Sequence, residues 1–277
     1  MIRLIKSDFK KFFCDKLFLI VLILAAVFAV ITPILYVLIF EFAGEMDATT
    51  EQMLSGYLSA KGQFFGSFSF GNNLGLIAPI LIGIILCKDF SFGTVRNKII
   101  SGHSRTSIFL SNFIVCVTVL FGIMLAHALL TLFVSLPFFE YQSTPFTTED
   151  FYYLLESLFF QFLIYLFVAA FVTWLSVVMK NTGLVIVMYI AVVFGFTMIA
   201  GILQIAIIAL ETKPDMNKLV EFLNFLQRIN IFNSSATVGV GTSYNAKDVV
   251  YYAFIPIVST AAVLGHGILK FGKKDLK

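Results

Sequence analysis

The chain has 277 residues, of which 59% are hydrophobic and 13% are charged. This hydrophobic fraction exceeds the roughly 45–50% of soluble domains, and it excludes a disordered chain, a disulfide-stapled secreted module and a nucleic-acid binder. Six stretches contain no Asp, Glu, Lys or Arg, and each is at least as long as the ~20 helical residues that cross a bilayer. Their unbroken apolar composition indicates helices, because strands of a membrane barrel alternate in polarity. We therefore expect an all-α polytopic membrane protein.

Residues 1–16 are predicted to form an amphipathic helix that lies in the cytoplasmic membrane interface. Apolar residues recur there at helical spacing, at Ile2, Ile5, Phe9 and Phe12, and basic residues occupy the other faces. Such a helix is either a simple membrane anchor or a docking surface for a cytoplasmic partner. The candidate docking residues are Ile5, Phe9, Lys10 and Phe12.

Residues 17–277 are predicted to form one transmembrane domain of six helices. The spans are expected at about 17–40, 66–87, 108–136, 157–179, 184–208 and 249–269. Four glycines form two small-xxx-small pairs near the outer end of the second span, which would let another helix approach closely. These glycines are Gly62, Gly66, Gly71 and Gly75.

The longest connection lies between the last two predicted spans. An outer amphipathic helix is expected to begin at Pro214, because proline suits a first helical turn. Its apolar stripe, which includes Leu219, Phe222 and Ile229, should lie at the membrane interface or dip into the bundle. Residues 230–245 are rich in Asn, Ser, Thr and Gly and are expected to form an irregular turn.

Basic residues orient the predicted spans. Of the 19 Lys and Arg residues, 14 fall in the N-terminal tail, the second-to-third connection, the segment after the fourth span and the C-terminal tail. Segments rich in Lys and Arg stay in the cytoplasm, whereas acidic residues contribute little to orientation. Both termini are therefore expected to be cytoplasmic in a multi-pass plasma-membrane protein, and the basic side would face the lipid headgroups of the inner leaflet.

Signatures of catalysis are absent from the sequence. It contains no phosphate-binding loop, no H-E-x-x-H zinc pattern, no G-x-S-x-G elbow and no C-x-x-C pair. We expect no enzymatic activity, metal or cofactor in this chain. Ionisable residues inside a membrane are the default functional candidates, and two polar exceptions stand out as pathway candidates, His127 in the third span and Glu156 at the outer start of the fourth. The alternatives are a neutral imidazole hydrogen-bonded to a neighbouring helix and an interfacial carboxylate in water.

The connection over residues 88–105 is the most informative segment. Thr94 is predicted to cap a short helix through Ile100, Gly102 to close it in a left-handed conformation, and Ser104 to cap the third span. This stub helix should project two basic side chains toward the cytoplasm and turn two apolar ones back or into a partner. The four residues are Arg96 and Lys98, and Val95 and Ile99.

This segment resembles the one after the second helix in permease subunits of ABC-2 type ATP-binding-cassette exporters. The recurring pattern there is an acidic residue, then Gly-Thr with a basic residue two positions on, then Ser-Arg before the third helix. The sequence has Asp89, Gly93-Thr94, Arg96 and Ser104-Arg105 at these places. The resemblance extends over nearly the whole chain, since the basic N-terminal helix, the six spans and the long outer connection follow in the same order.

The resemblance implies a division of labour between proteins. Two permease subunits, identical or paralogous, would form the pathway in a bacterial plasma membrane. Two separate ATPase subunits, which bind ATP and Mg²⁺, would grip the interfacial helix and the stub helix over residues 94–100, known as a coupling helix. The implied coupling residues are Asp89, Gly93, Thr94, Val95, Arg96, Lys98 and Arg105.

The expected function is therefore export of a hydrophobic or amphipathic substrate, such as an antimicrobial peptide, a drug or a lipid, driven by partner ATPases. Two alternatives stay open at this point. One is a non-transporting membrane scaffold or sensor that holds a cytoplasmic partner through the same basic surfaces. The other is an ion-coupled carrier, in which His127 would be essential.

Overall fold

The computed structural model describes residues 1–42, 59–139, 146–179, 181–211, 213, 216–238 and 246–273. The described residues form helices joined by turns and contain no strand, which confirms the all-α fold. The helices are α1 (Ile2–Cys14), α2 (Lys16–Phe42), α4 (Ala60–Gly66), α5 (Ile77–Ser91), α6 (Thr94–Ile100), α7 (Arg105–Phe138), α8 (Thr148–Met179), α9 (Thr182–Glu211), α10 (Asn217–Ile229), α11 (Ile231–Val238) and α12 (Ala246–Gly272).

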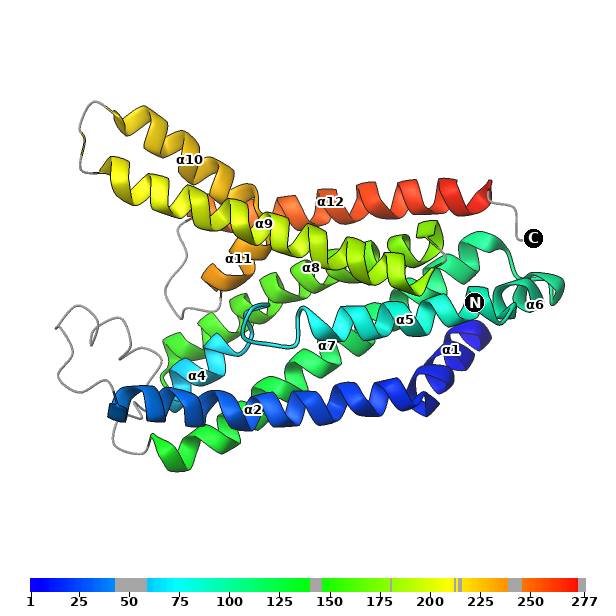
Figure 1. Cartoon of the computed structure of the whole chain (residues 1–277), viewed down its shortest axis with the longest axis horizontal. Helices are drawn as coiled ribbons and strands as arrows, with labels where there is room; N and C mark the ends of the chain where they lie inside the picture. Colours follow the sequence, from blue (N-terminus) through cyan, green and yellow to red (C-terminus); the bar gives the residue numbers. More distant parts are fainter. Residues whose placement is uncertain are drawn as a thin grey trace.

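Among the described helices, five are long and apolar enough to cross a membrane, namely α2, α7, α8, α9 and α12. They correspond to the first and the last four predicted spans and are consistent with a membrane-embedded protein. The long helices run side by side, and α8 lies at the centre, where it packs against α5, α7, α9 and α12 (Figure 1). Most side chains of α8 that face these neighbours are buried, whereas α2 and α9 expose large apolar side chains around the bundle, as lipid contact requires.

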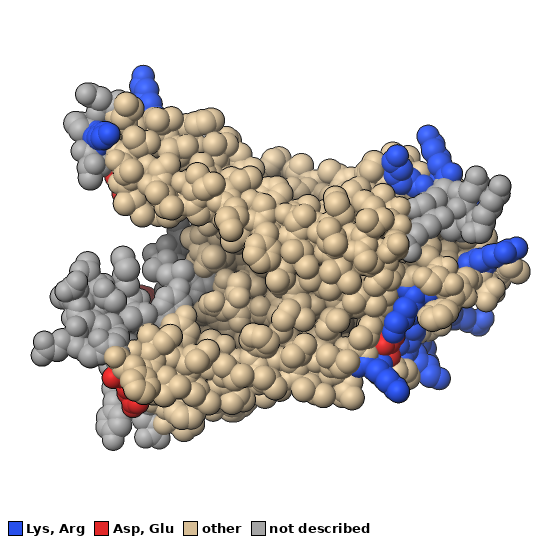
Figure 2. All heavy atoms as spheres, viewed as in Figure 1, with Lys and Arg blue, Asp and Glu red and all other residues tan. Residues whose placement is uncertain are grey.

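The start of α1 and the end of α12 lie at the same end of the bundle, together with α6 (Figure 1). Figure 2 shows Lys and Arg side chains gathered at this end. We call it the basic end. The chain passes from the basic end to the opposite end along α7, returns along α8, leaves again along α9 and returns along α12 (Figure 1).

The predicted second span is not one continuous helix. Within residues 66–87, the chain ends α4 at Gly66, turns irregularly and begins α5 only at Ile77. Polar side chains satisfy the interrupted backbone, since Asn72 Nδ2 donates to the Gly66 carbonyl at 3.1 Å and Tyr189 Oη donates to the Gly75 carbonyl at 2.8 Å. Irregular backbone at membrane depth is tolerated when protein buries it in this way. At its other end α5 meets α6 at an angle of 59°, and this bent pair together also satisfies the length and polarity of a span.

Two of the four glycines in the predicted small-xxx-small pairs serve the turn. Gly71 and Gly75 lie in the irregular stretch, so the pair predicted there is not on a helix, whereas Gly62 and Gly66 both lie on α4. A Cβ atom at Gly75 would lie 2.4 Å from the carbonyl oxygen of Phe70, whereas a Cβ at Gly71 would meet nothing within 4 Å. The requirement for glycine is thus a close backbone approach at Gly75.

The outer connection holds two helices where one was expected. The described part of the predicted amphipathic helix is α10, whose residues are all at least partly exposed, and its predicted start at Pro214 lies outside the described residues. The irregular turn expected over 230–245 is wrong for residues 231–238, which form α11. Asn230 explains the difference, because its Oδ1 accepts from the backbone N–H of Phe232 at 3.2 Å and so caps the helix.

Buried polar contacts hold α11 inside the bundle. Ser235 Oγ donates to Gln161 Oε1 on α8 at 2.9 Å and accepts from the backbone N–H of Phe70 at 2.8 Å. Gln161 Nε2 in turn donates to the Ser235 carbonyl at 2.9 Å. We call these three residues the Ser235 node. The node joins α8, α11 and the irregular stretch between α4 and α5.

Candidate functional site

The stub helix predicted at the basic end is present as α6, with ends close to those expected. It begins at Thr94, but the residue that caps it is Gly93, whose φ of +68° is left-handed, and no side chain caps this end. Gly102 closes the segment with a φ of +87°, as predicted. Ser104 caps α7 through Oγ, which accepts from the backbone N–H of Ser107 at 3.2 Å, again as predicted.

The apolar side of α6 faces back into the protein. Val95 is buried, and Ile99 is half-buried against the same apolar cluster, which confirms the direction expected for both. The cluster draws residues from α1, α7, α8 and α12. Its other buried members are Leu4, Ile108, Phe109, Val177 and Phe271.

Beside this apolar contact lies a buried ionic cluster made of Asp8, Lys11, Asp89, Lys98 and Ser111. Lys98 Nζ lies 2.6 Å from Asp8 Oδ1 and 3.5 Å from Asp89 Oδ2. Lys11 Nζ lies 2.7 Å from Asp89 Oδ1, and Ser111 Oγ donates to Asp8 Oδ2 at 2.6 Å. The four ionised groups sum to zero charge, as buried charges must when each needs a partner.

The ionic cluster corrects the direction expected for Lys98. Its side chain does not project into the cytoplasm but lies against two carboxylates, each only 2% exposed. Arg96, two residues earlier and therefore on the opposite face of the helix, is exposed as predicted. The sequence argument missed Asp8 and Lys11, although Asp8 stands four residues from both Leu4 and Phe12, and all three share the buried face of α1.

Four helices are fixed to one another by this cluster, because Asp8 and Lys11 lie on α1, Asp89 on α5, Lys98 on α6 and Ser111 on α7. Burial lowers the pKa of Lys11 below its ordinary value, an effect that the attraction of Asp89 opposes without reversing it. Such an arrangement resists displacement, since moving α5 away would leave Lys11 without Asp89, and moving α6 away would leave Asp8 without Lys98.

Two further contacts brace the basic end. Lys88 Nζ lies 2.6 Å from Asp15 Oδ2, at the junction of α1 and α2. Burial raises the pKa of Asp15, but the hydrogen bond from Lys88 and one from the backbone N–H of Leu17 outweigh it and hold the pKa below its ordinary value. Arg105 Nη1 donates to the carbonyl of Gly272 at 3.0 Å, so a cation caps the C-terminus of α12.

The outer surface of the bend between α5 and α6 is apolar and basic. Phe92 is 77% exposed and Ile100 is 74% exposed, and Arg96 is exposed on the same short segment. We call these three residues the α6 face.

The predicted docking residues of α1 have different surroundings. Lys10 is exposed, and Ile5 and Phe9 are half-buried against the core. Phe12 is fully buried in the core of the bundle, so it attaches α1 to its own chain. The exposed apolar residues of α1 include Ile2 and Phe13.

The two pathway candidates lie apart from the basic end. His127 is buried on α7, and both of its ring nitrogens lack a hydrogen-bond partner within the described part of the chain, which corrects the expectation of a bond to a neighbouring helix. It lines a cavity of about 10 Å³, room for one water molecule, together with polar groups that include Gln63 and Asn72. Glu156 is exposed on α8. The structure does not bring His127 and Glu156 together on one face.

Within the described ranges, no group of three or more His, Cys, Asp and Glu side chains is arranged to hold a metal ion.

The chain was compared with protein families, curated proteins and solved structures. A family model described as "Protein of unknown function (DUF2705)" matches residues 66–277. No curated protein and no solved structure matches the chain.

Proposed function

We propose that this chain, which belongs to the DUF2705 family of proteins of unknown function, is the membrane permease subunit of an ATP-binding-cassette exporter. It would form the substrate pathway with a second permease subunit and take its energy from separate ATPase subunits bound at the basic end. ATP and Mg²⁺ would be held by those ATPases, in line with the missing phosphate-binding loop.

The observation that carries this proposal is the way α6 is attached to the helix bundle. Its α6 face, made of Phe92, Arg96 and Ile100, is open to a partner, while its inner face is joined to α1, α5 and α7 by the ionic cluster. A partner that pushes on the α6 face would therefore also displace the long helices. The reason is that Lys98, through its ion pair, and Val95, through its apolar contacts, hold α6 directly against the bundle.

The topology that we propose has six spans, with α4, the irregular stretch and α5 together forming the second. We assign the basic end to the cytoplasm of a plasma membrane, because Lys and Arg gather there (Figure 2) and basic segments stay inside. The α6 face would then meet a cytoplasmic partner. The substrate would be hydrophobic or amphipathic, since it must pass between spans that carry few charges.

The test is to extract the affinity-tagged full-length chain from its native membrane in mild detergent and to measure ATP hydrolysis by the isolated complex. We expect an ATP-binding-cassette ATPase to co-purify in stoichiometric amount. The double variant Arg96→Glu with Ile100→Glu should lose the ATPase, because it places two carboxylates on an apolar and basic contact.

Lys218→Glu on α10 is the matched control, since it also reverses a charge but lies at the opposite end of the bundle. It should retain the ATPase. A chain that purifies alone and moves substrate across reconstituted vesicles without ATP would contradict the proposal. A stable complex that hydrolyses ATP but transports nothing would favour the scaffold alternative instead.

A further inference from the structure

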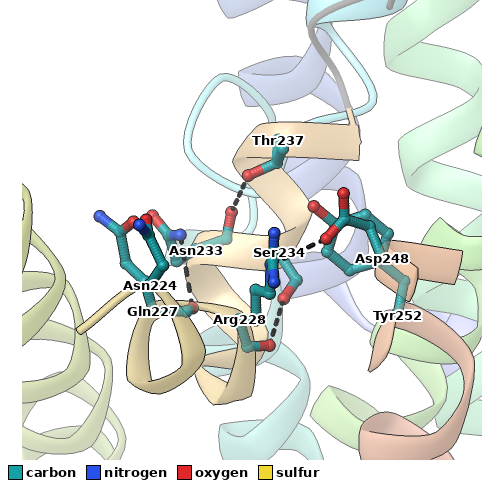
Figure 3. Close-up of a pocket in the computed structure, with 8 residues that line it drawn as sticks. All are labelled: Asn224, Gln227, Arg228, Asn233, Ser234, Thr237, Asp248 and Tyr252. Carbon is teal, nitrogen blue, oxygen red and sulfur yellow. Dashed lines mark hydrogen bonds and ion pairs between the residues drawn. The ribbon is translucent and has the colours of Figure 1, made fainter. Parts of the chain in front are cut away.

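A second site lies at the opposite end, where α10, α11 and the start of α12 enclose a polar cavity of about 200 Å³ (Figure 3). A cavity of this volume has room for several water molecules. Figure 3 shows that the side chains lining it come from all three helices. Those that matter most are Asn224, Gln227 and Arg228 of α10, Asn233 of α11, and Asp248 and Tyr252 of α12.

An ion pair forms one wall of the cavity. Arg228 Nε lies 2.8 Å from Asp248 Oδ1, and the side chains are 39% and 15% exposed. Each charge also suits its helix end, because Arg228 lies in the last turn of α10 and Asp248 in the first turn of α12. The pair is thus held in place by two helices and presents a cation and an anion side by side.

This ion pair leaves hydrogen-bonding capacity unused. A guanidinium has five N–H donors, and Asp248 Oδ1, although 2.8 Å from the Nε of Arg228, accepts no hydrogen bond from the described residues. The terminal Nη groups of Arg228 and the Oδ2 of Asp248 make no hydrogen bond to any residue in the part of the chain that the structure describes. As far as the described residues are concerned, these atoms can bind a second pair of charges.

The remaining wall is made of carboxamides. Gln227 Nε2 donates to Gln204 Oε1 at 2.6 Å, and Asn233 Nδ2 donates to the Gln227 carbonyl at 3.5 Å. Both amide nitrogens are therefore directed into the protein's own contacts. This leaves the amide oxygens of Gln227 and Asn233, and the whole amide of Asn224, as neutral partners for a polar ligand.

We propose that this cavity binds a compact zwitterion of the α-amino acid class. Its carboxylate would accept from the Nη groups of Arg228, and its ammonium would donate to Asp248 Oδ2 and to the amide oxygens of the wall. Because the wall carries one charge of each sign, a zwitterion can engage both members of the Arg228–Asp248 pair at once, whereas a ligand with a single charge can engage only one of them.

Other ligand classes fit less well. Sugars bind against an open aromatic face, but Tyr252, the aromatic residue that lines this cavity, is only 5% exposed. A whole peptide or lipid is larger than a cavity of about 200 Å³, so only part of such a molecule could enter it. The proposal is independent of ATPase coupling, because the cavity lies at the end opposite α6 (Figure 1), so either proposal can fail alone.

The test is calorimetric titration of the purified full-length chain in detergent with L-glutamine and with glycine. Sodium acetate, methylammonium chloride and glucose serve as the single-charge and uncharged probes. We expect saturable binding of the amino acids and none of the other three. Arg228→Gln and Asp248→Asn should each weaken amino-acid binding by about tenfold or more, because each removes charge-assisted hydrogen bonds.

Two further variants separate binding from folding. Asn224→Leu leaves the ion pair intact but replaces an amide of the wall with an apolar side chain of similar shape, so it should weaken binding while the thermal midpoint of the unliganded chain stays unchanged. Lys218→Gln removes a cation from the same helix outside the cavity and should bind as the wild type does. Binding of glucose in preference to amino acids, the absence of any amino-acid binding, or wild-type affinity in Arg228→Gln would each overturn the proposal.

Discussion

Asp8→Asn is the most direct test of the ionic cluster, because it removes one charge with little change in shape. Lys98 Nζ lies 2.6 Å from Asp8 Oδ1, which at an effective dielectric constant of 20 corresponds to a gross attraction of about 6 kcal/mol. Its second partner, Asp89, is 3.5 Å away and contributes about 5 kcal/mol on the same scale. Desolvation offsets most of both values. The measured cost of breaking such a buried pair is about 3–5 kcal/mol, because the remaining charge stays buried.

Hydrogen exchange of the α1 backbone amides, measured on the full-length chain in detergent, would report this cost locally. We expect Asp8→Asn to lower the protection of α1 by about 100-fold or more, since each 1.4 kcal/mol corresponds to a factor of ten. Lys98→Met should have a similar effect, because it leaves Asp8 without its cation. Lys10→Met removes an exposed cation from the same helix and is the control, with protection close to that of the wild type.

The double variant Asp8→Asn with Lys98→Met distinguishes an ion pair from two independent contacts. It leaves the Lys11–Asp89 pair neutral and intact, so it should be no less protected than either single variant. The coupling energy in the double-mutant cycle should therefore be about 3 kcal/mol, near the upper end of values for residues in contact. Strictly additive effects would refute the view that the two charges stabilise α1 through each other.

Two other predictions concern the backbone of the second span and the acid stability of the basic end. Gly75→Ala should lower the free energy of unfolding by about 1–3 kcal/mol, because its Cβ would meet the Phe70 carbonyl oxygen at 2.4 Å. Gly71→Ala is the control, because a Cβ there meets nothing within 4 Å. Equal thermal midpoints for the two variants would contradict the close approach at Gly75. Because the pKa of Asp15 lies below the ordinary value of 3.8, the contribution of the Lys88–Asp15 pair is fully present above that value and is lost as pH falls through the lower folded pKa. Thermal midpoints measured from pH 7 to pH 2 should therefore fall less steeply below pH 4 in Asp15→Asn than in the wild type. Parallel profiles would show that the Lys88–Asp15 pair does not contribute to this acid sensitivity.

The long helices could be predicted from the sequence because the bilayer imposes one requirement on all of them. A charge-free run of sufficient length must hydrogen-bond its own backbone, and a helix does so without help from other segments. The second span does not follow this rule, because it is not one continuous helix. Its run of 26 residues without charges contains Gly71, Asn72, Asn73 and Gly75, and their side chains or close approaches allow a turn that neighbouring helices complete.

Some features of the candidate site are determined by neighbouring residues in the sequence, and others by residues far away in the chain. The ends of α6 follow from residues within it or beside it, so Gly102 and Ser104 were readable from the sequence. The direction of Lys98 depends on Asp8, which is 90 residues earlier in the chain. No local pattern predicts that pairing. What the sequence does hold is an acidic residue on the buried face of an amphipathic helix, a position that demands a cation from elsewhere.

Composition was a poor guide to α11 for a related reason. Asn, Ser and Thr favour turns when their side chains bond to their own backbone. At α11 the local bond made by Asn230 caps a helix and does not form a turn, and Ser235 bonds to Gln161 on α8. The same polar groups that indicate a turn in isolation thus stabilise a helix once partners across the bundle accept them.

Helix α5 connects the two irregular regions of the molecule. Its C-terminal end carries Asp89 of the ionic cluster, and its N-terminal end follows the stretch that the Ser235 node holds against α8 and α11. With 15 residues at about 1.5 Å each, α5 spans only about 22 Å. Under the proposed function, a push on α6 would move this short helix as a rigid body, since a regular helix resists compression. The strain would then fall on the turn before Ile77, where the backbone is already irregular, and through Ser235 it would reach the helices at the opposite end of the bundle.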